Sequence, residues 1–384
     1  MSFEGQPNPG QPRVLHIASW FPSPVHASLG NFIERHIAAI GTKVPGAAVV
    51  AAVASRGPSH VAVGEVAGTN IPVVRAYHGT GRPGLSRATA ALDRAVRWVR
   101  HRGFRPDLIH LHVTYPGGRA ARRWAERWDV PLIVTEHWTG LSDSGPERRI
   151  PAWQLRDMRR TARRAAVVCP VSSDLALGMK RRGLESRYQI IPNVVDTAAF
   201  PLSTTPRAPH LLHVSSMSDG QKNVTGLLEA FAKARPQLAA ETRLRLIGQN
   251  DLPRHRATIS RLNLQDNVDV LGGVWPDRVA AEMQAASALV LNSRYENFPC
   301  VLPEAWSSGL PVVAPDVGGI REGLKAELGK LIPAGDDSAL VQALVDIQSA
   351  TFDREALHRH AREVYGVEAV AQAYLDVYNS CLDG

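Results

Sequence analysis

Short apolar runs of strand length alternate with helix-like stretches along most of this 384-residue chain. In the first half the strand-like runs occupy 13–20, 47–54, 71–76, 108–113 and 132–135, and helix-like stretches occupy 85–100 and 118–128. In the second half the strand-like runs occupy 211–216, 243–248, 268–273, 288–292 and 311–314. Short apolar runs between helical stretches are typical of strands that are buried on both faces. The alternation therefore predicts α/β domains, each a doubly wound and mostly parallel sheet with helices on its faces.

The chain is long enough for two domains of this kind, each with its own core. We expect a disordered leader at 1–12, a first domain at 13–203 that a C-terminal helix at about 365–384 completes, and a second domain at 204–364. The segment 200–210 is rich in Pro, Ser and Thr and predicts the linker. No apolar run approaches the roughly 20 residues that span a bilayer. Three widely spaced cysteines favour a cytoplasmic protein over a disulfide framework.

Polar side chains gather directly after the strand-like run at 288–292. Glu296 and Glu304 stand eight positions apart, across a short loop and a predicted helix start. Ligands bind at the carboxyl edge of a parallel sheet, where the unpaired amides of a helix start suit phosphate and carboxylates suit sugar hydroxyls. The amides at this helix start belong to Phe298, Cys300 and Val301. One glutamate alone is better explained by a solvated helix face, but the combination predicts a nucleotide-sugar pocket.

This segment, 293–306, reads Ser-Arg-Tyr-Glu-Asn-Phe-Pro-Cys-Val-Leu-Pro-Glu-Ala-Trp. It resembles the donor-site signature of the retaining glycosyltransferases of family 4, and the resemblance continues through Gly318-Gly319 and Glu322. The resemblance implies the GT-B fold, with two Rossmann-like domains facing across a cleft and a last helix that crosses back to the first domain. It also implies retaining transfer of a sugar from a UDP- or GDP-type nucleotide sugar to a hydroxyl of a glycan or lipid-linked acceptor.

The same resemblance implies roles for residues of the second domain. Glu304 is expected on the ribose hydroxyls and Glu296 near the donor sugar, and Asn297 is a further donor-binding candidate. The backbone of Val274 is expected at the base. Lys222, in a loop between a predicted strand and a predicted helix, is expected to place a point charge on the diphosphate.

One phosphate contact of the family has no counterpart in this chain. Family members usually have an arginine shortly before the diphosphate-binding lysine, where this chain reads Ser215-Ser216-Met217. Arg294 and Arg321 stay open as replacements.

The first domain contributes further candidates at the ends of its predicted strands. The resemblance implies that Gly30 donates its N–H to the diphosphate, and the alternative is a plain loop glycine. His137 ends a strand beside Trp138, and we expect it to bind a donor-sugar hydroxyl and to line the reaction centre. Tyr115 and Trp138 are expected to line an acceptor site by stacking on carbohydrate. For His112 an acceptor-lining role and a structural role are equally open.

The formal net charge of +8 favours anionic partners. Five arginines, Arg156, Arg159, Arg160, Arg163 and Arg164, form one stripe on a predicted helix. The stripe is either a solvated helix face or a peripheral contact with an anionic membrane surface. We expect no nucleic-acid partner, because the chain has no recognition motif for one.

The expected reaction needs no metal and no other cofactor. No Asp-x-Asp pair occurs in the sequence, so the carboxylates that usually coordinate a donor-bound divalent cation are missing. The negative charge of the leaving group then has to be stabilised by Lys222 and by helix-terminal amides. With His137 and Glu296 expected near the donor sugar, the catalytic candidates are His137, Lys222 and Glu296. Two alternatives stay open. A catalytically silent nucleotide-sugar-binding scaffold would not turn over a donor, and a GT-B sugar-nucleotide epimerase would invert a donor centre without any acceptor.

Overall fold

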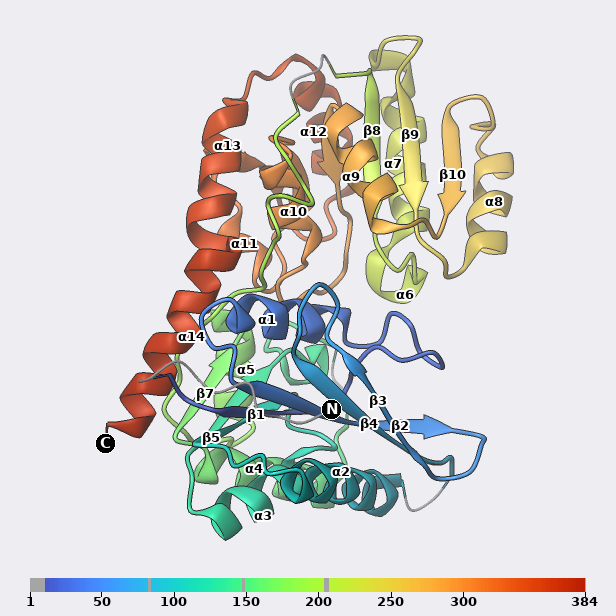
Figure 1. The fold of residues 1–384 in the computed structure, drawn as a ribbon. Coiled ribbons are helices and arrows are strands. Elements are labelled where there is room, and N and C mark those ends of the chain that lie inside the picture. The colour runs from blue at the N-terminus through green and yellow to red at the C-terminus, as the bar shows by residue number, and fades with distance from the viewer. Residues whose placement is uncertain (1–10, 82–83, 147–148, 204–206, 384) are drawn as a thin grey trace. The chain divides into compact units, whose positions relative to one another are not determined.

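The computed structural model describes residues 11–81, 84–146, 149–203 and 207–383, and the chain forms two compact units (Figure 1). The first unit lies within Met1–Asp143, Glu147–Val194 and Val367–Gly384, and the second comprises Ser144–Pro146 and Val195–Gly366. Each unit contains its own sheet, of seven strands in the first and six in the second. The prediction of two mainly parallel α/β domains is confirmed.

The first unit is built on the strand order β3-β4-β2-β1-β5-β6-β7. The strands are β1 (Val14–Ala18), β2 (Ala47–Ser55), β3 (Val61–Glu65), β4 (Pro72–Gly79), β5 (Leu108–His112), β6 (Leu132–Glu136) and β7 (Val167–Pro170). The helices are α1 (Asn31–Gly41), α2 (Gly84–His101), α3 (Gly118–Trp128), α4 (Ala152–Arg164), α5 (Ser173–Arg181) and α14 (Val367–Leu382). All five residues of β1 are buried, as expected for a central strand.

The edge strand β3 is absent from the sequence prediction. It pairs antiparallel with β4, whereas the other strand pairs of this sheet are parallel. None of its five residues is fully buried. Such a short strand, with a glycine as its fourth residue, has neither the apolar run nor the clean alternation that marks a strand in a sequence.

The second unit has the strand order β10-β9-β8-β11-β12-β13, and the pairs are parallel throughout. The strands are β8 (His210–Val214), β9 (Arg243–Ile247), β10 (Val268–Gly272), β11 (Ala288–Val290), β12 (Val312–Pro315) and β13 (Gly329–Ile332). The helices are α6 (Asp219–Lys222), α7 (Val224–Ala234), α8 (Leu252–Arg261), α9 (Pro276–Ala285), α10 (Val301–Ser307), α11 (Ile320–Gly323), α12 (Asp337–Ser349) and α13 (Arg354–His360). The strand order reverses between β8 and β11, and such a switch point is where open α/β sheets bind ligands.

The second unit begins at Val195, nine residues before the boundary expected from the linker composition. The N–H of Val195 donates to the carbonyl oxygen of Tyr365 (2.8 Å), and the Ser307 hydroxyl donates to the carbonyl oxygen of Phe200 (2.6 Å). The segment before 204 is therefore bonded into the second unit instead of acting as a free linker.

Helix α14 returns the chain to the first unit. Val370, Tyr374, Val377 and Tyr378 are buried on one face and share the core of α1 and the sheet. This packing is the helix crossing that the family resemblance implied, with the first unit resuming at Val367 instead of about 365.

The described residues bear on two further expectations, the disordered leader and the absence of a membrane-spanning segment. Most of the expected leader, residues 1–10, lies outside the described residues, while Gln11 donates to the carbonyl oxygen of Lys43 (2.8 Å). Across the described ranges, no helix combines the length and the apolar character needed to cross a bilayer.

Candidate functional site

Lys222 and Glu296 form an ion pair at the switch point of the second sheet. Lys222 lies in the segment that follows β8, and Glu296 lies in the loop that follows β11, its neighbour in the sheet. The Lys222 ammonium bonds Glu296 Oε1, with side-chain exposures of 14% and 6%. Two residues that the sequence predicted separately are therefore in direct contact, in surroundings where screening by water is weak.

The Glu296 loop is packed against the glycine pair that follows β12. Gly318 has a φ of +52°, and a Cβ on it would lie 1.8 Å from the carbonyl oxygen of Glu296. The N–H of Gly319 donates to the carbonyl oxygen of Asn297 (2.6 Å). Gly318 is thus required by the close approach of two backbones, and together with the Gly319 hydrogen bond this packing positions Glu296 and Asn297.

Replacing Gly318 with Ala is expected to destabilise the second unit and to weaken ligand binding there. A left-handed backbone costs a non-glycine residue about 1–2 kcal/mol, and the new methyl group also has to displace the Glu296 backbone. The matched control is Gly335→Ala, because Gly335 has a φ of +73° and nothing within 4 Å of the added Cβ. Urea unfolding of both variants separates the two effects, and equal losses of stability would contradict the steric explanation.

The turn that carries Lys222 is held by Asp219, the first residue of α6. The Asp219 carboxylate accepts a hydrogen bond from the N–H of Thr225 (2.7 Å) and lies 3.1 Å from the Arg254 guanidinium. Its own N–H donates to the carboxylate of Asp251 (2.8 Å). Burial alone would raise the pKa of Asp219, but the hydrogen bonds from Thr225 and the charge of Arg254 lower it. The carboxylate therefore stays ionised and holds the turn.

The remaining donor-site candidates follow the same sheet edge. Glu304 lies in the first turn of α10 and is 4% exposed, which removes the solvated-face alternative. Cys300 is the N-cap residue of α10 and Val301 its first residue, and the Phe298 ring stacks on Tyr365 with 5.1 Å between centroids. Val274 lies between β10 and α9, on the far side of β9 from these groups in the strand order.

In the first unit, a buried carboxylate organises the loop after β6. Glu136 accepts hydrogen bonds from the N–H groups of Thr114, His137 and Trp138, each 2.9 Å long, and from the Thr114 hydroxyl. Burial raises the pKa of Glu136, and these hydrogen bonds oppose the shift. The sequence reasoning gave Glu136 no role, although an acid directly before the candidate His137 at a strand end is a visible signal.

His137 lies in a buried aromatic cluster. Its ring centroid is 4.6 Å from that of Phe32 and 5.0 Å from that of His36, and the Asn193 side chain acts to raise the pKa of both histidines, against the effect of burial. Burial and the neighbouring His36 lower the pKa of His137 well below its usual value, so the imidazole is neutral. A neutral imidazole can form a hydrogen bond with a sugar hydroxyl, and the contact of His137 with a donor sugar stays a prediction. Asn193 is a second residue that the sequence reasoning assigned no role.

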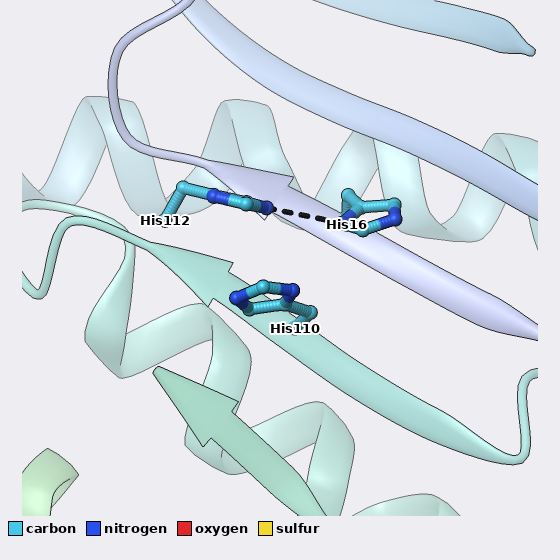
Figure 2. Close-up of side chains that lie close together, drawn as sticks. All are labelled: His16, His110 and His112. Carbon is cyan, nitrogen blue, oxygen red and sulfur yellow. Dashed lines mark hydrogen bonds between the residues drawn. The ribbon is translucent and has the colours of Figure 1, made fainter. Parts of the chain in front are cut away.

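His112 belongs to a group of three buried histidines, His16, His110 and His112 (Figure 2). Nδ1 of His16 lies 3.0 Å from Nε2 of His112, and His110 bonds the hydroxyls of Tyr378 (2.6 Å) and Thr135 (2.7 Å). His112 is fully buried, which favours its structural role over an acceptor-lining one.

The three histidines are close enough to coordinate a metal ion, with one ring nitrogen of each lying within 4.8 Å of the others. Their hydrogen bonds argue against that use. His110 already has a partner on both nitrogens, and an ion between His16 and His112 would leave a buried N–H on each ring without an acceptor.

A cavity of about 300 Å³ opens within the first unit, beyond the carboxyl ends of β1, β2 and β4. Trp20, Phe21, Leu29 and Val53 line its apolar part. Of the three predicted acceptor-site residues, only Tyr115 lines it. Its mainly apolar wall with a few polar groups is typical of small-molecule sites.

Two other candidates of the first unit have structural roles. Gly30 caps α1 with a φ of +75°, and a Cβ on it would lie 2.6 Å from the carbonyl oxygen of Trp20. The turn therefore requires glycine whether or not a ligand binds. Trp138 is half-buried, and its ring packs so closely on Gly140 that an added Cβ would lie 2.5 Å from it.

The arginine stripe on α4 is not one free face. Arg159 donates to the carbonyl oxygen of Arg182 (2.7 Å), Arg163 pairs with Glu185 (3.2 Å), and Arg164 donates to the carbonyl oxygen of Val130 (3.3 Å). Arg156 and Arg160 are exposed. Most of the stripe thus serves the fold of the first unit.

Two family models match consecutive parts of the chain. The model described as Glycosyltransferase Family 4 matches residues 33–199, and the model described as Glycosyl transferases group 1 matches residues 208–349. Together the matched ranges include β8, β11 and every donor-site candidate of the second unit.

Individual relatives and solved structures agree with these matches. The phosphatidyl-myo-inositol mannosyltransferase of Mycobacterium leprae is 29% identical over 328 residues, which cover 82% of this chain and 83% of the relative. Sucrose-phosphate synthase from Thermosynechococcus elongatus has a TM-score of 0.79 at 20% identity, covering 96% of this chain and 98% of the other. The Anabaena protein HepE in complex with UDP has a TM-score of 0.72 at 19% identity, covering 96% and 100%. The chain is therefore a member of the family 4 glycosyltransferases, enzymes that have the GT-B fold and use nucleotide-sugar donors.

Proposed function

We propose that this enzyme transfers a hexosyl group from a UDP- or GDP-type nucleotide sugar to a hydroxyl of a glycan or lipid-linked acceptor, with retention of configuration. The observation that carries the proposal is the partly buried Lys222–Glu296 pair at the switch point of the second sheet. It joins a cation suited to a diphosphate with a carboxylate suited to sugar hydroxyls. HepE, which shares the fold, is described in complex with UDP, and this supports a nucleoside diphosphate as the leaving group.

In the proposed reaction, the bond between the anomeric carbon and the diphosphate oxygen breaks as the acceptor oxygen bonds the same face of that carbon. The proton of the acceptor hydroxyl passes to the departing phosphate oxygen. Lys222 stabilises the negative charge that develops on the diphosphate, which is electrostatic catalysis by a preorganised cation. Glu296 orients Lys222 and accepts a hydrogen bond from the donor sugar. We propose that no metal ion takes part, which follows from the missing Asp-x-Asp pair.

The acceptor is proposed to bind in the cavity of the first unit, with Tyr115 among its contacts. Its mainly apolar wall suits an acceptor that carries a lipid or an apolar group next to its hydroxyl. The relative from Mycobacterium leprae is a mannosyltransferase acting on a phosphatidylinositol, which supports a mannosyl donor and a lipid-linked acceptor here. Contact with an anionic membrane surface stays a prediction, and it now depends on Arg156 and Arg160.

The first test is binding of nucleotides to the purified protein with EDTA present. We expect one of UDP, GDP or ADP, or its sugar, to raise Tm by several degrees, because a ligand that binds only the folded state stabilises it. The same donor should then be turned over with an acceptor, and NMR of the product should show the anomeric configuration of the donor. Loss of binding in EDTA would contradict metal independence.

The alternatives give different results in the same experiments. A scaffold protein would show binding without turnover, and an epimerase would change the donor without any acceptor. Membership of the glycosyltransferase family favours neither alternative.

A further inference from the structure

A second cationic side chain, that of Arg294, contacts the turn that carries Lys222. The guanidinium of Arg294 donates from Nη1 to the carbonyl oxygen of Asp219 and from Nη2 to Oδ1 of Asn223, both at 2.6 Å. The N–H of Arg294 donates to the carbonyl oxygen of Gln221 (2.8 Å). Arg294 therefore binds the segment on both sides of Lys222, although it comes from the loop after β11.

The charge of Arg294 has no counter-ion among the residues that the structure describes. Both acceptors of its guanidinium are neutral oxygens, and no carboxylate among the described residues pairs with it. Arg294 is also exposed. A guanidinium has five N–H donors, so Arg294 keeps donors that can bind an incoming anion.

Two other arginines of the second unit, Arg321 and Arg254, have their charges paired. Arg321, the second sequence candidate, lies 2.7 Å from the Asp316 carboxylate. Arg254 lies 3.1 Å from the Asp219 carboxylate. Arg294 is thus the arginine of these three with a charge available to a ligand.

Lys222 alone does not supply the positive charge that a diphosphate needs. Its ammonium is paired with Glu296, so the net charge of the pair is close to zero. Ser216, where the family resemblance places an arginine, is exposed and uncharged. A nucleoside diphosphate carries several negative charges, which require a further cation at this turn.

The guanidinium is held in a fixed orientation before any ligand binds. Asn223 adopts a left-handed conformation with a φ of +49°, which asparagine tolerates better than most residues. Its amide fits beside Gly226, where an added Cβ would lie 2.6 Å from Nδ2. Because this contact fixes the amide, the Arg294 guanidinium is already oriented, and its side chain loses little conformational entropy when a ligand binds.

We propose that Arg294 binds the diphosphate of the donor together with Lys222 and replaces the arginine that is missing at Ser216. This inference rests on the proposed function, since it assumes a nucleoside diphosphate at the switch point of the second sheet. An arginine that presents two or more N–H groups to phosphate oxygens forms strong, charge-assisted hydrogen bonds.

The test is calorimetric titration of Arg294→Ala with whichever of UDP, GDP and ADP the native protein binds best, and with the matching monophosphate. We expect the Kd of the diphosphate to rise about 10- to 100-fold, because hydrogen bonds to charged groups are worth about 1.5–3 kcal/mol. The Kd of the monophosphate should rise less. Arg294→Lys should recover part of the loss, because it keeps the charge. The matched control Arg321→Ala should bind as the native protein does.

A purely positioning role of Arg294 is tested by Asn223→Gly, which removes the amide acceptor and still permits the left-handed backbone. We expect it to raise the Kd by less than about threefold. Equal losses in Asn223→Gly and Arg294→Ala, or a native Kd in Arg294→Ala, would overturn the inference. Lys222→Ala distinguishes a failure of this inference from a failure of the proposed function. If it weakens binding while Arg294→Ala does not, only the inference fails, whereas a native protein that binds none of the three diphosphates overturns the proposed function and the inference together.

Discussion

Lys222→Ala is expected to lower kcat for sugar transfer by about 10²- to 10³-fold, the usual effect of removing one preorganised charge-stabilising donor. The negative charge on the diphosphate grows as the bond to the sugar breaks, so the loss should fall mainly on kcat and less on the KM of the donor. Initial-rate kinetics with the donor identified by binding measure both constants. A folded Lys222→Ala variant that turns over within threefold of the native rate would remove Lys222 from the mechanism.

The control for this prediction has to distinguish the loss of the Lys222 charge in catalysis from a loss of folding stability. Lys222→Ala leaves Glu296 buried without its partner, and breaking a buried pair in this way destabilises a protein by about 3–5 kcal/mol. The double variant Lys222→Met with Glu296→Gln removes both charges, so it should fold more stably than Lys222→Ala and still be inactive. Lys330→Ala is the matched single control, because Lys330 also pairs with a carboxylate of the second unit, that of Asp346 at 2.6 Å. It should keep native activity.

The first unit is expected to lose most of its stability between pH 6.5 and pH 5. Burial lowers the pKa of His16 to about 3 and that of His36 to about 4, and it lowers the pKa values of His110, His112 and His137 well below 6.5. The unfolded chain binds protons at these histidines below pH 6.5, and the folded unit does not. The stability that they contribute is therefore present above pH 6.5 and lost as the pH falls.

For His16 and His36, whose pKa values fall to about 3 and about 4, the cost is about 2 kcal/mol of unfolding free energy each at pH 5 relative to pH 8. The shifts of His110, His112 and His137 act in the same direction, and the total is a large part of the about 5–15 kcal/mol that stabilises an ordinary domain. Urea unfolding followed at several pH values measures the slope. His36→Gln should reduce the slope by about one proton, because the folded unit keeps His36 neutral in this range. A slope of less than one proton between pH 6.5 and pH 5 would contradict the prediction.

Much of the fold could be predicted because its signals are local. The central strands are buried on both faces and read as apolar runs, so β1, β2, β5 and β6 were located within a few residues. The apolar face of α14 was visible in the spacing of Val370, Tyr374, Val377 and Tyr378. The half-exposed edge strand β3 has no local signal of this kind, and the contacts that bond residues before 204 to the second unit have no compositional signature.

The candidate site could be predicted where residue type and position in a motif were sufficient. Lys222, Glu296 and Glu304 were found by their placement after strands, and the structure puts all three in the second unit. Burial was not predictable in the same way. Nothing next to His112 in the sequence shows that three histidines from two neighbouring strands meet inside the sheet.

By itself, the sequence determined the class of fold, the family and the segment that contains the donor-site carboxylates, because periodicity and short motifs are properties of adjacent residues. Only the tertiary structure decided which charges meet. Lys222 and Glu296 are 74 positions apart, and Arg294 and Asp219 are 75 positions apart. Contacts of this separation exist because β8 and β11 pair as neighbours in the sheet, so the loops that follow them lie side by side. That pairing leaves Arg294 on the Lys222 turn and Arg321 paired with Asp316, a distinction that no local pattern in the chain contains.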